Sequence, residues 1–215
     1  MKQHMECTFE RMKNVNIPIW SGIVYKLEYD LMLLCSGKIP YEEVRHYIGV
    51  LAQKATVEER NPKMASFGIA KCHELPSDAM VDFFFRPTYY AASIMAKAVL
   101  MYPELLELRI GTRAGETLSD VLSKVLLCCT DIEFCGHGYD AISALLDTLD
   151  IFGQADMYDF VAKYPEICPE FTKLYKGTLE DLKPCLHGEK LTGAWGEDYT
   201  ERVKEVLENN VIAAE

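Results

Sequence analysis

The chain has a shortage of basic residues, and no stretch of it gathers them. It carries 33 acidic residues against 22 lysines and arginines among 215 residues, which gives a formal net charge of -11. A nucleic-acid-binding surface needs basic residues on one face, because contacts to phosphates supply most of the affinity. Attraction to an anionic membrane surface needs a similar cluster. The composition therefore predicts that the protein binds neither nucleic acid nor a membrane.

The sequence also lacks a long apolar run. The longest segment without a charged side chain covers residues 14–25, which is well short of the roughly 20 apolar residues of a membrane-spanning helix. The first residues, MKQHMECTFERMKNVN, have no apolar core of the signal-peptide kind. The eight cysteines form no CxxC pair, and a chain of this length buries a sufficient core without disulfides. We therefore expect reduced cysteines and a cytoplasmic location.

Several motifs that carry chemistry are missing. There is no P-loop, GxGxxG, GxSxG or HExxH. The sequence therefore lacks the motifs on which common nucleotide-binding, hydrolase and zinc-protease sites are built. Nothing in the sequence implies a cofactor, and the residues indicate no known family.

Apolar residues recur at steps of three and four along most of the chain. Segment 116–129, ETLSDVLSKVLLCC, carries one continuous apolar stripe, which is typical of a helix that faces a core. Segment 20–37 shows the same spacing and ends at Gly37. Alternation of the strand type appears only in DIEFCGHG. We predict an all-α protein with a single domain over residues 1–215.

Glycine and proline mark a coarse rhythm. Helix starts are expected just after Arg86, near Gly138 and near Gly196, and these positions are 52 and 58 residues apart. Between them, MYPELLEL and KYPEICPEF share Tyr-Pro-Glu. We interpret the rhythm as stacked antiparallel helical hairpins, since one hairpin cannot bury its stripe alone; a chance match is the alternative. The period is similar to that of α/α toroids, a likeness that carries no functional residues. Only four hairpins fit, so we expect an open α/α array or an irregular bundle.

Segment 131–141, DIEFCGHGYDA, holds the residue types best suited to chemistry. In an extended chain, Asp131, Glu133, Cys135 and His137 project to one side. Such side chains bind divalent metals, but this spacing supplies at most two or three donors, so we predict no metal. A Cys135–His137 nucleophile pair is a second interpretation, although such partners usually come from distant segments. The third is a helix corner, in which the two glycines allow positive φ angles.

Two further segments combine aromatic and polar side chains near expected helix starts. Arg86 precedes Tyr89 in FFFRPTYYAA, and Trp195 lies in the glycine-broken segment LTGAWGEDY. An arginine beside tyrosines suits a carboxylate or a sugar ring. The alternatives are an arginine whose stem covers aromatic core and a tryptophan that covers the core.

If the rhythm reflects stacked hairpins, these helix starts share one rim. Free N–H groups and helix dipoles there favour an anionic or hydroxyl-rich ligand. The predicted ligand-binding residues are Arg86, Tyr89, His137, Tyr139 and Trp195. We therefore predict a protein that binds a partner segment or a small polar ligand at this rim.

The alternative function is an enzyme that acts on a small polar or carbohydrate-like substrate. His137 with Asp140 or Asp131 would then perform acid/base chemistry, which requires two titratable groups near one ligand atom. The surface around His137 distinguishes the two functions. A deep pocket lined by polar groups favours the enzyme, and a shallow apolar groove favours the binding protein.

Overall fold

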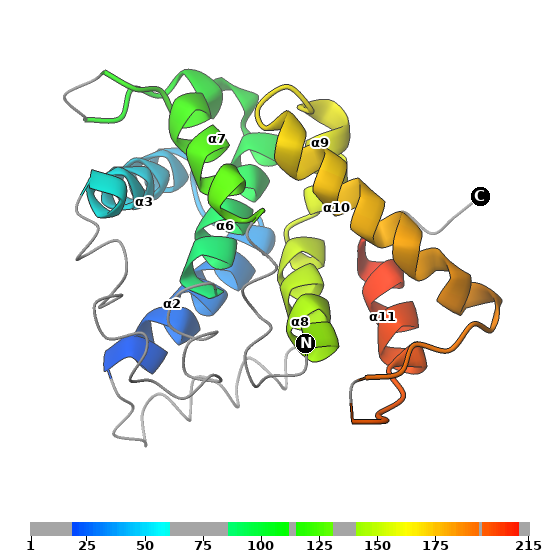
Figure 1. The fold of residues 1–215 in the computed structure, drawn as a ribbon. Coiled ribbons are helices and arrows are strands. Elements are labelled where there is room, and N and C mark those ends of the chain that lie inside the picture. Colours follow the sequence, from blue (N-terminus) through cyan, green and yellow to red (C-terminus); the bar gives the residue numbers. More distant parts are fainter. Residues whose placement is uncertain (1–18, 61–85, 112–114, 131–140, 194, 211–215) are drawn as a thin grey trace.

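The computed structural model describes residues 19–60, 86–111, 115–130, 141–193 and 195–210 (Figure 1). These residues form α-helices and two short 3-10 helices, in the order α2 (Ile19–Cys35), α3 (Tyr41–Arg60), α6 (Arg86–Met101), η3 (Pro103–Glu107), α7 (Leu118–Cys128), α8 (Ala141–Gln154), α9 (Met157–Lys163), α10 (Pro169–Leu182), η5 (Lys183–His187) and α11 (Thr200–Asn210). Pairing of the β type in this part of the chain is limited to isolated bridges. The predicted all-α class is confirmed.

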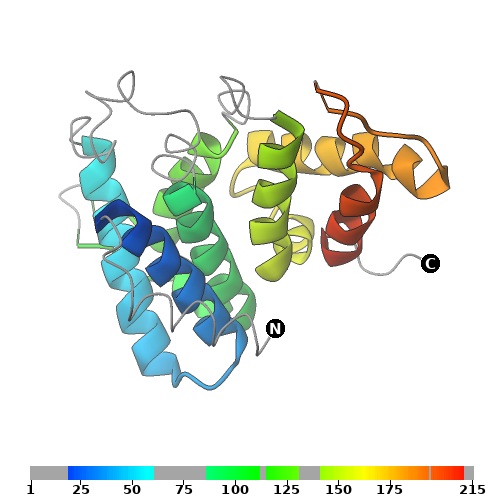
Figure 2. The same ribbon diagram turned by 90° about the horizontal axis from the view of Figure 1, so that it is seen from below.

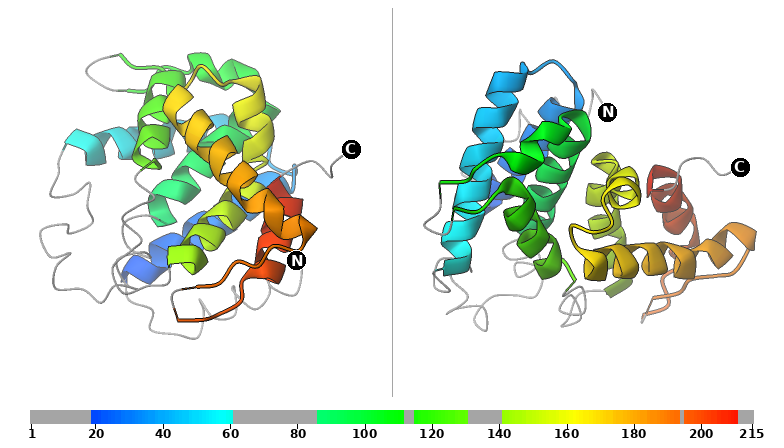
Figure 3. Two further views of the ribbon diagram at one scale, coloured as in Figure 1. Left: turned by 45° about the vertical axis from the view of Figure 1, so that its right-hand side comes forward. Right: turned by 90° about the horizontal axis from the view of Figure 1, so that it is seen from above.

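Helix α6 lies at the centre of the bundle. It packs against α2, α3, α7, α8 and α9. Many of its buried residues are small (Ala91, Ala92, Ser93, Ala96 and Ala98), which lets neighbouring helices approach closely. Figure 3 shows α2, α3 and α7 around it on one side of the molecule, with α10 and α11 on the other. The arrangement is that of a bundle around one helix, and regular stacking of hairpins stays a prediction.

The two Tyr-Pro-Glu sequences end helices in the same way. After α6 and α9, the N–H groups of Tyr102 and Tyr164 donate to carbonyls four residues earlier. The residues three positions further on, Leu105 and Ile167, donate their N–H groups to the tyrosine carbonyls and bury their side chains. Because proline cannot continue a helix interior, the tripeptide acts as a stop. The tripeptide follows a helix of 16 residues in one case and a helix of 7 residues in the other. Because the two helices differ so much in length, the matching tripeptides alone do not establish a repeat.

Helix α7 matches the predicted segment 116–129 closely. It begins after Thr117, whose hydroxyl accepts from the Asp120 N–H, while the Asp120 carboxylate accepts from the Thr117 N–H at 2.8 Å. This reciprocal capping satisfies two backbone donors that a helix start otherwise leaves free. Its buried residues, Leu118, Val121, Leu122 and Leu126, belong to the apolar stripe that the sequence predicts.

A buried polar residue joins the last helices. Asn210, at the end of α11, is 2% exposed. Its side-chain amide donates to the Leu149 carbonyl of α8 at 2.9 Å and to the Val206 carbonyl at 2.8 Å. Its side-chain carbonyl accepts from the Tyr175 hydroxyl of α10. One side chain therefore connects α8, α10 and α11.

Candidate functional site

Helices α6, α8 and α11 begin at the same end of the molecule. All three starts lie toward the bottom of Figure 1, and they lie toward the top of Figure 2, where the molecule is seen from below. Helix α8 packs between the other two, since it contacts both α6 and α11. The N-terminal turns and the positive ends of three helix dipoles therefore lie at one end of the molecule.

The residues that precede α11 form a hydrogen-bonded hairpin, which we call the Trp195 loop (residues 191–193 and 195–199). The Gly193 N–H donates to the Glu197 carbonyl at 2.8 Å, and the Tyr199 N–H donates to the Leu191 carbonyl at 2.9 Å. Trp195 lies at the tip of the hairpin, enclosed by both pairs in the sequence, and its side chain is 68% exposed. The expectation that this tryptophan covers the core is wrong, because the hairpin carries it outward.

Further contacts tie the Trp195 loop to the start of α11. The Asp198 carboxylate accepts from the Thr200 hydroxyl at 2.6 Å and from the Thr200 N–H at 3.0 Å. These two hydrogen bonds hold the pKa of Asp198 below its usual range. The Thr200 hydroxyl in turn accepts from the Leu191 N–H at 3.2 Å. Gly196 has a φ of +90°, in the region that favours glycine. These contacts hold the described residues on either side of Trp195 to one another and to the start of α11.

The remaining predicted site residues do not all lie where a ligand could contact them. Tyr89 is 1% exposed and its ring meets the Phe152 ring edge-on, with 5.7 Å between centroids, so the ring belongs to the core. Arg86 begins α6, at the expected end of the molecule. Four residues, Asp131, His137, Tyr139 and Asp140, lie outside the described residues. The proposed acid/base chemistry and the shared rim therefore stay predictions.

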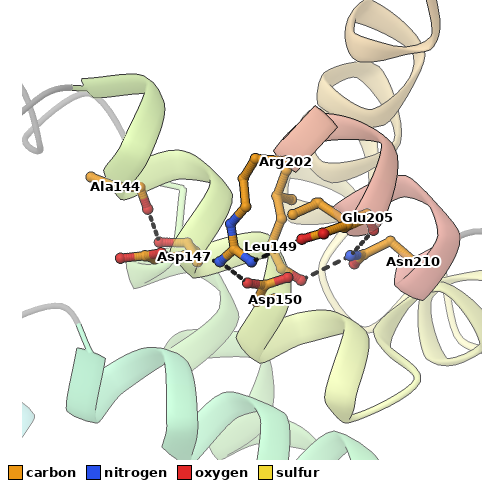
Figure 4. Close-up of polar contacts among 9 residues, drawn as sticks. Ala144, Asp147, Leu149, Asp150, Arg202, Glu205 and Asn210 are labelled. Atoms are coloured by element: carbon orange, nitrogen blue, oxygen red, sulfur yellow. Dashed lines mark hydrogen bonds and ion pairs between the residues drawn. The ribbon is translucent and has the colours of Figure 1, made fainter. Parts of the chain in front are cut away.

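One arginine and three carboxylates form a cluster at the contact of α8 and α11 (Figure 4), and this cluster was not predicted from the sequence. The Arg202 guanidinium of α11 donates to Asp147 at 3.3 Å and also to Asp150, both on α8. Glu205 lies 3.7 Å from the same guanidinium. Burial raises the pKa of the Asp150 carboxyl, and Arg202 acts in the opposite direction. In the sequence, the only indication was the spacing of Asp147 and Asp150, which places two carboxylates on one side of α8. This spacing does not identify the helix that supplies their partner.

We expect the Arg202→Met variant to lose about 1 kcal/mol of unfolding free energy at pH 7. A single partly exposed ion pair contributes little. The loss is larger here because three carboxylates lose the same cation. Without Arg202 the pKa of Asp150 rises further above its unfolded value. A raised carboxyl pKa in the folded state lowers stability as the pH rises through it. The deficit of the variant should therefore shrink as the pH falls through the carboxyl range. Urea unfolding from pH 4 to 7 measures it, and a deficit independent of pH would contradict this account.

A second feature that the sequence analysis missed is a cleft of about 310 Å³, which we call the charged cleft. Its apolar lining consists of Tyr41 at the start of α3, Leu105 of η3 and Leu108. The Tyr41 ring meets the Tyr102 ring edge-on with 5.0 Å between centroids. Its charged lining consists of Arg45, Glu104, Glu107 and Arg109. In Figures 2 and 3, the start of α3 and the end of α6 lie together, at the end of the molecule away from the Trp195 loop.

The described cysteines and acidic residues show neither a disulfide nor a cluster suited to a metal. No two of these cysteines are joined, and no group of three or more histidine, cysteine or acidic side chains in the described ranges could hold a metal ion. Burial raises the pKa of the Cys129 and Cys168 thiols. Because the thiolate is the nucleophile, these two thiols are poor nucleophiles at neutral pH.

Comparison of the chain with protein-family models, with curated proteins and with solved structures finds no match. No helix in the described ranges is long and apolar enough to cross a membrane.

Proposed function

We propose that the protein is a binding protein that docks a protein partner at the end where α6, α8 and α11 begin, with Trp195 as the anchor. The observation that carries the proposal is a 68% exposed tryptophan on a hydrogen-bonded hairpin. Tryptophan is enriched among the few residues that supply most of the binding energy at interfaces. Hydrogen bonds that already join the two sides of the loop also reduce the entropy lost on binding.

The charges around the Trp195 loop indicate the chemistry of the partner. Glu189, Glu197 and Asp198 are exposed on or beside the loop, and Lys190 is the one basic residue among positions 189–201. Lys190 lies 3.7 Å from the Asp198 carboxylate, so it is already engaged. An apolar pocket bordered by basic groups would complement this surface, since complementary charges increase association rates and specificity. A cytoplasmic location stays the expectation drawn from the cysteine pattern.

We expect the Trp195→Ala variant to recover its main partner at least about tenfold less than the wild type, because loss of a single anchor commonly costs more than 1 kcal/mol. The experiment is quantitative affinity capture from cell extract. Leu127→Ala is the matched control, since Leu127 is 50% exposed on α7, away from this loop. Stability should change by less than about 0.5 kcal/mol in either variant.

A second measurement reports the environment of Trp195 directly. In Trp20→Phe protein, the remaining tryptophan fluorescence comes from Trp195. Addition of the captured partner should shift this emission to the blue, because docking removes the indole from water. Equal capture by Trp195→Ala and wild type, with no spectral shift, would overturn the proposal.

A further inference from the structure

The charged cleft contains groups of both signs that do not neutralise one another. Glu104 and Glu107 form no ion pair with another residue of the described ranges. Arg45 approaches Glu42 at 4.0 Å, with 51% of its side chain exposed. Arg109 donates one hydrogen bond to the Gly115 carbonyl at 3.0 Å. A guanidinium has five N–H donors, so most donors of both arginines remain for a ligand.

The apolar part of the cleft is held more firmly than the charged part. Leu105 is 1% exposed, and its N–H donates to the Tyr102 carbonyl. The Leu108 carbonyl accepts from the Leu118 N–H at 2.8 Å, and its side chain lies close to Gly49 of α3. Leu105 therefore lies beneath the lining, and the partly exposed side chains of Tyr41 and Leu108 provide the apolar surface of the cleft.

We propose that the charged cleft binds a small amphiphilic zwitterion, of the class formed by apolar amino acids and short peptides. The ligand carboxylate accepts hydrogen bonds from Arg45 and Arg109, which bind carboxylates in a planar geometry. The ligand ammonium donates to Glu104 or Glu107, and the apolar side chain packs on Tyr41 and Leu108, the partly exposed apolar residues of the lining. This site is separate from the Trp195 loop and does not depend on the proposed function.

Size and charge both restrict the ligand. Ligand pockets commonly measure about 300–1,000 Å³, and a volume of about 310 Å³ is at the lower limit. A ligand with a single charge would leave an opposite charge of the cleft without a partner and would place its own charge near like-charged groups, which reduces affinity. A ligand with both charges and an apolar group matches all three parts of the lining.

The test uses L-leucine as the probe in calorimetric titration of the full chain. We expect saturable binding with a Kd of about 1 mM, because the charged contacts are exposed to water. N-acetyl-L-leucine has no ammonium and L-leucinamide has no carboxylate. Each should bind at least about fivefold more weakly, as expected for loss of one charged contact of about 1 kcal/mol. Leucyl-leucine distinguishes the two sources of this chemistry: tighter binding than leucine assigns the cleft to short peptides, and weaker binding assigns it to free amino acids.

Two double variants locate the binding. Arg45→Gln/Arg109→Gln and Glu104→Gln/Glu107→Gln should each weaken leucine binding at least about fivefold. Lys173→Gln, an exposed position on α10, should bind leucine as the wild type does. Circular dichroism and thermal unfolding check that the double variants remain folded, which is expected because these four charged residues are exposed. The proposal is overturned if leucine shows no saturable binding, if the two blocked analogues bind as well as leucine, or if both double variants bind like the wild type.

Discussion

Replacement of Asn210 by alanine is expected to lower the free energy of unfolding by about 3 kcal/mol. The side chain is 2% exposed and contacts the Leu149 and Val206 carbonyls and the Tyr175 hydroxyl. Each buried polar group that loses its partner costs about 1–3 kcal/mol. The Leu149 carbonyl and the Tyr175 hydroxyl lie on other helices, so alanine removes a contact to each of α8 and α10. Urea unfolding followed by circular dichroism measures the loss.

Asn209→Ala is the matched control for this variant. Asn209 is the adjacent residue on α11, and it is exposed. Its replacement should change stability by less than about 0.5 kcal/mol. The Tyr175→Phe variant isolates one contact, because it removes the hydroxyl and leaves the packing of the ring against Phe152 and Phe171. It should show a part of the Asn210→Ala loss. Equal stabilities of Asn210→Ala and Asn209→Ala would contradict the buried network.

The sequence predicts the helices of this protein well where a local signal marks both the stripe and its end. Segment 116–129 contains α7, and Gly37 follows the end of α2 with a φ of +66°. The break between α8 and α9 was not predicted. Asp156 has a left-handed backbone conformation there and pairs with Lys97 of α6. The partner of Asp156 lies on a helix that is distant in the sequence, and local spacing contains no information on such a contact.

The position of the Trp195 loop was predictable from the sequence, and its conformation was not. Glycines around Trp195 indicated a loop before a helix, and the structure shows a hairpin there. The same pattern did not determine whether the indole turns inward or outward, because that depends on hydrogen bonds across residues 191–199. The charged cleft left no sequence signal. Its charged residues lie on α3, on η3 and just after η3, and only the packing of α3 near the end of α6 brings them together.

Replacement of Gly153 by alanine is the second substitution with a large expected effect, and its sign is opposite to the usual one. Alanine in place of glycine within a helix normally stabilises by up to about 1 kcal/mol. At Gly153 of α8, a Cβ atom would lie 2.9 Å from the Asn210 amide nitrogen and 3.0 Å from the Asn209 backbone carbonyl. Neither atom can move freely, since the first belongs to the buried network and the second to the α11 backbone.

The added methyl group must therefore push α11 away from α8. Overpacking of this kind costs about 1–3 kcal/mol, and displacement of Asn210 weakens its hydrogen bonds as well. We expect Gly153→Ala to lower the free energy of unfolding by about 2 kcal/mol after the gain in helix propensity is included. Gly177 of α10 provides the control, because a Cβ atom there meets nothing within 4 Å. Gly177→Ala should stabilise the protein by about 0.5–1 kcal/mol. Urea unfolding of both variants gives the comparison, and stabilisation by both would show that α8 and α11 are not in close contact at Gly153.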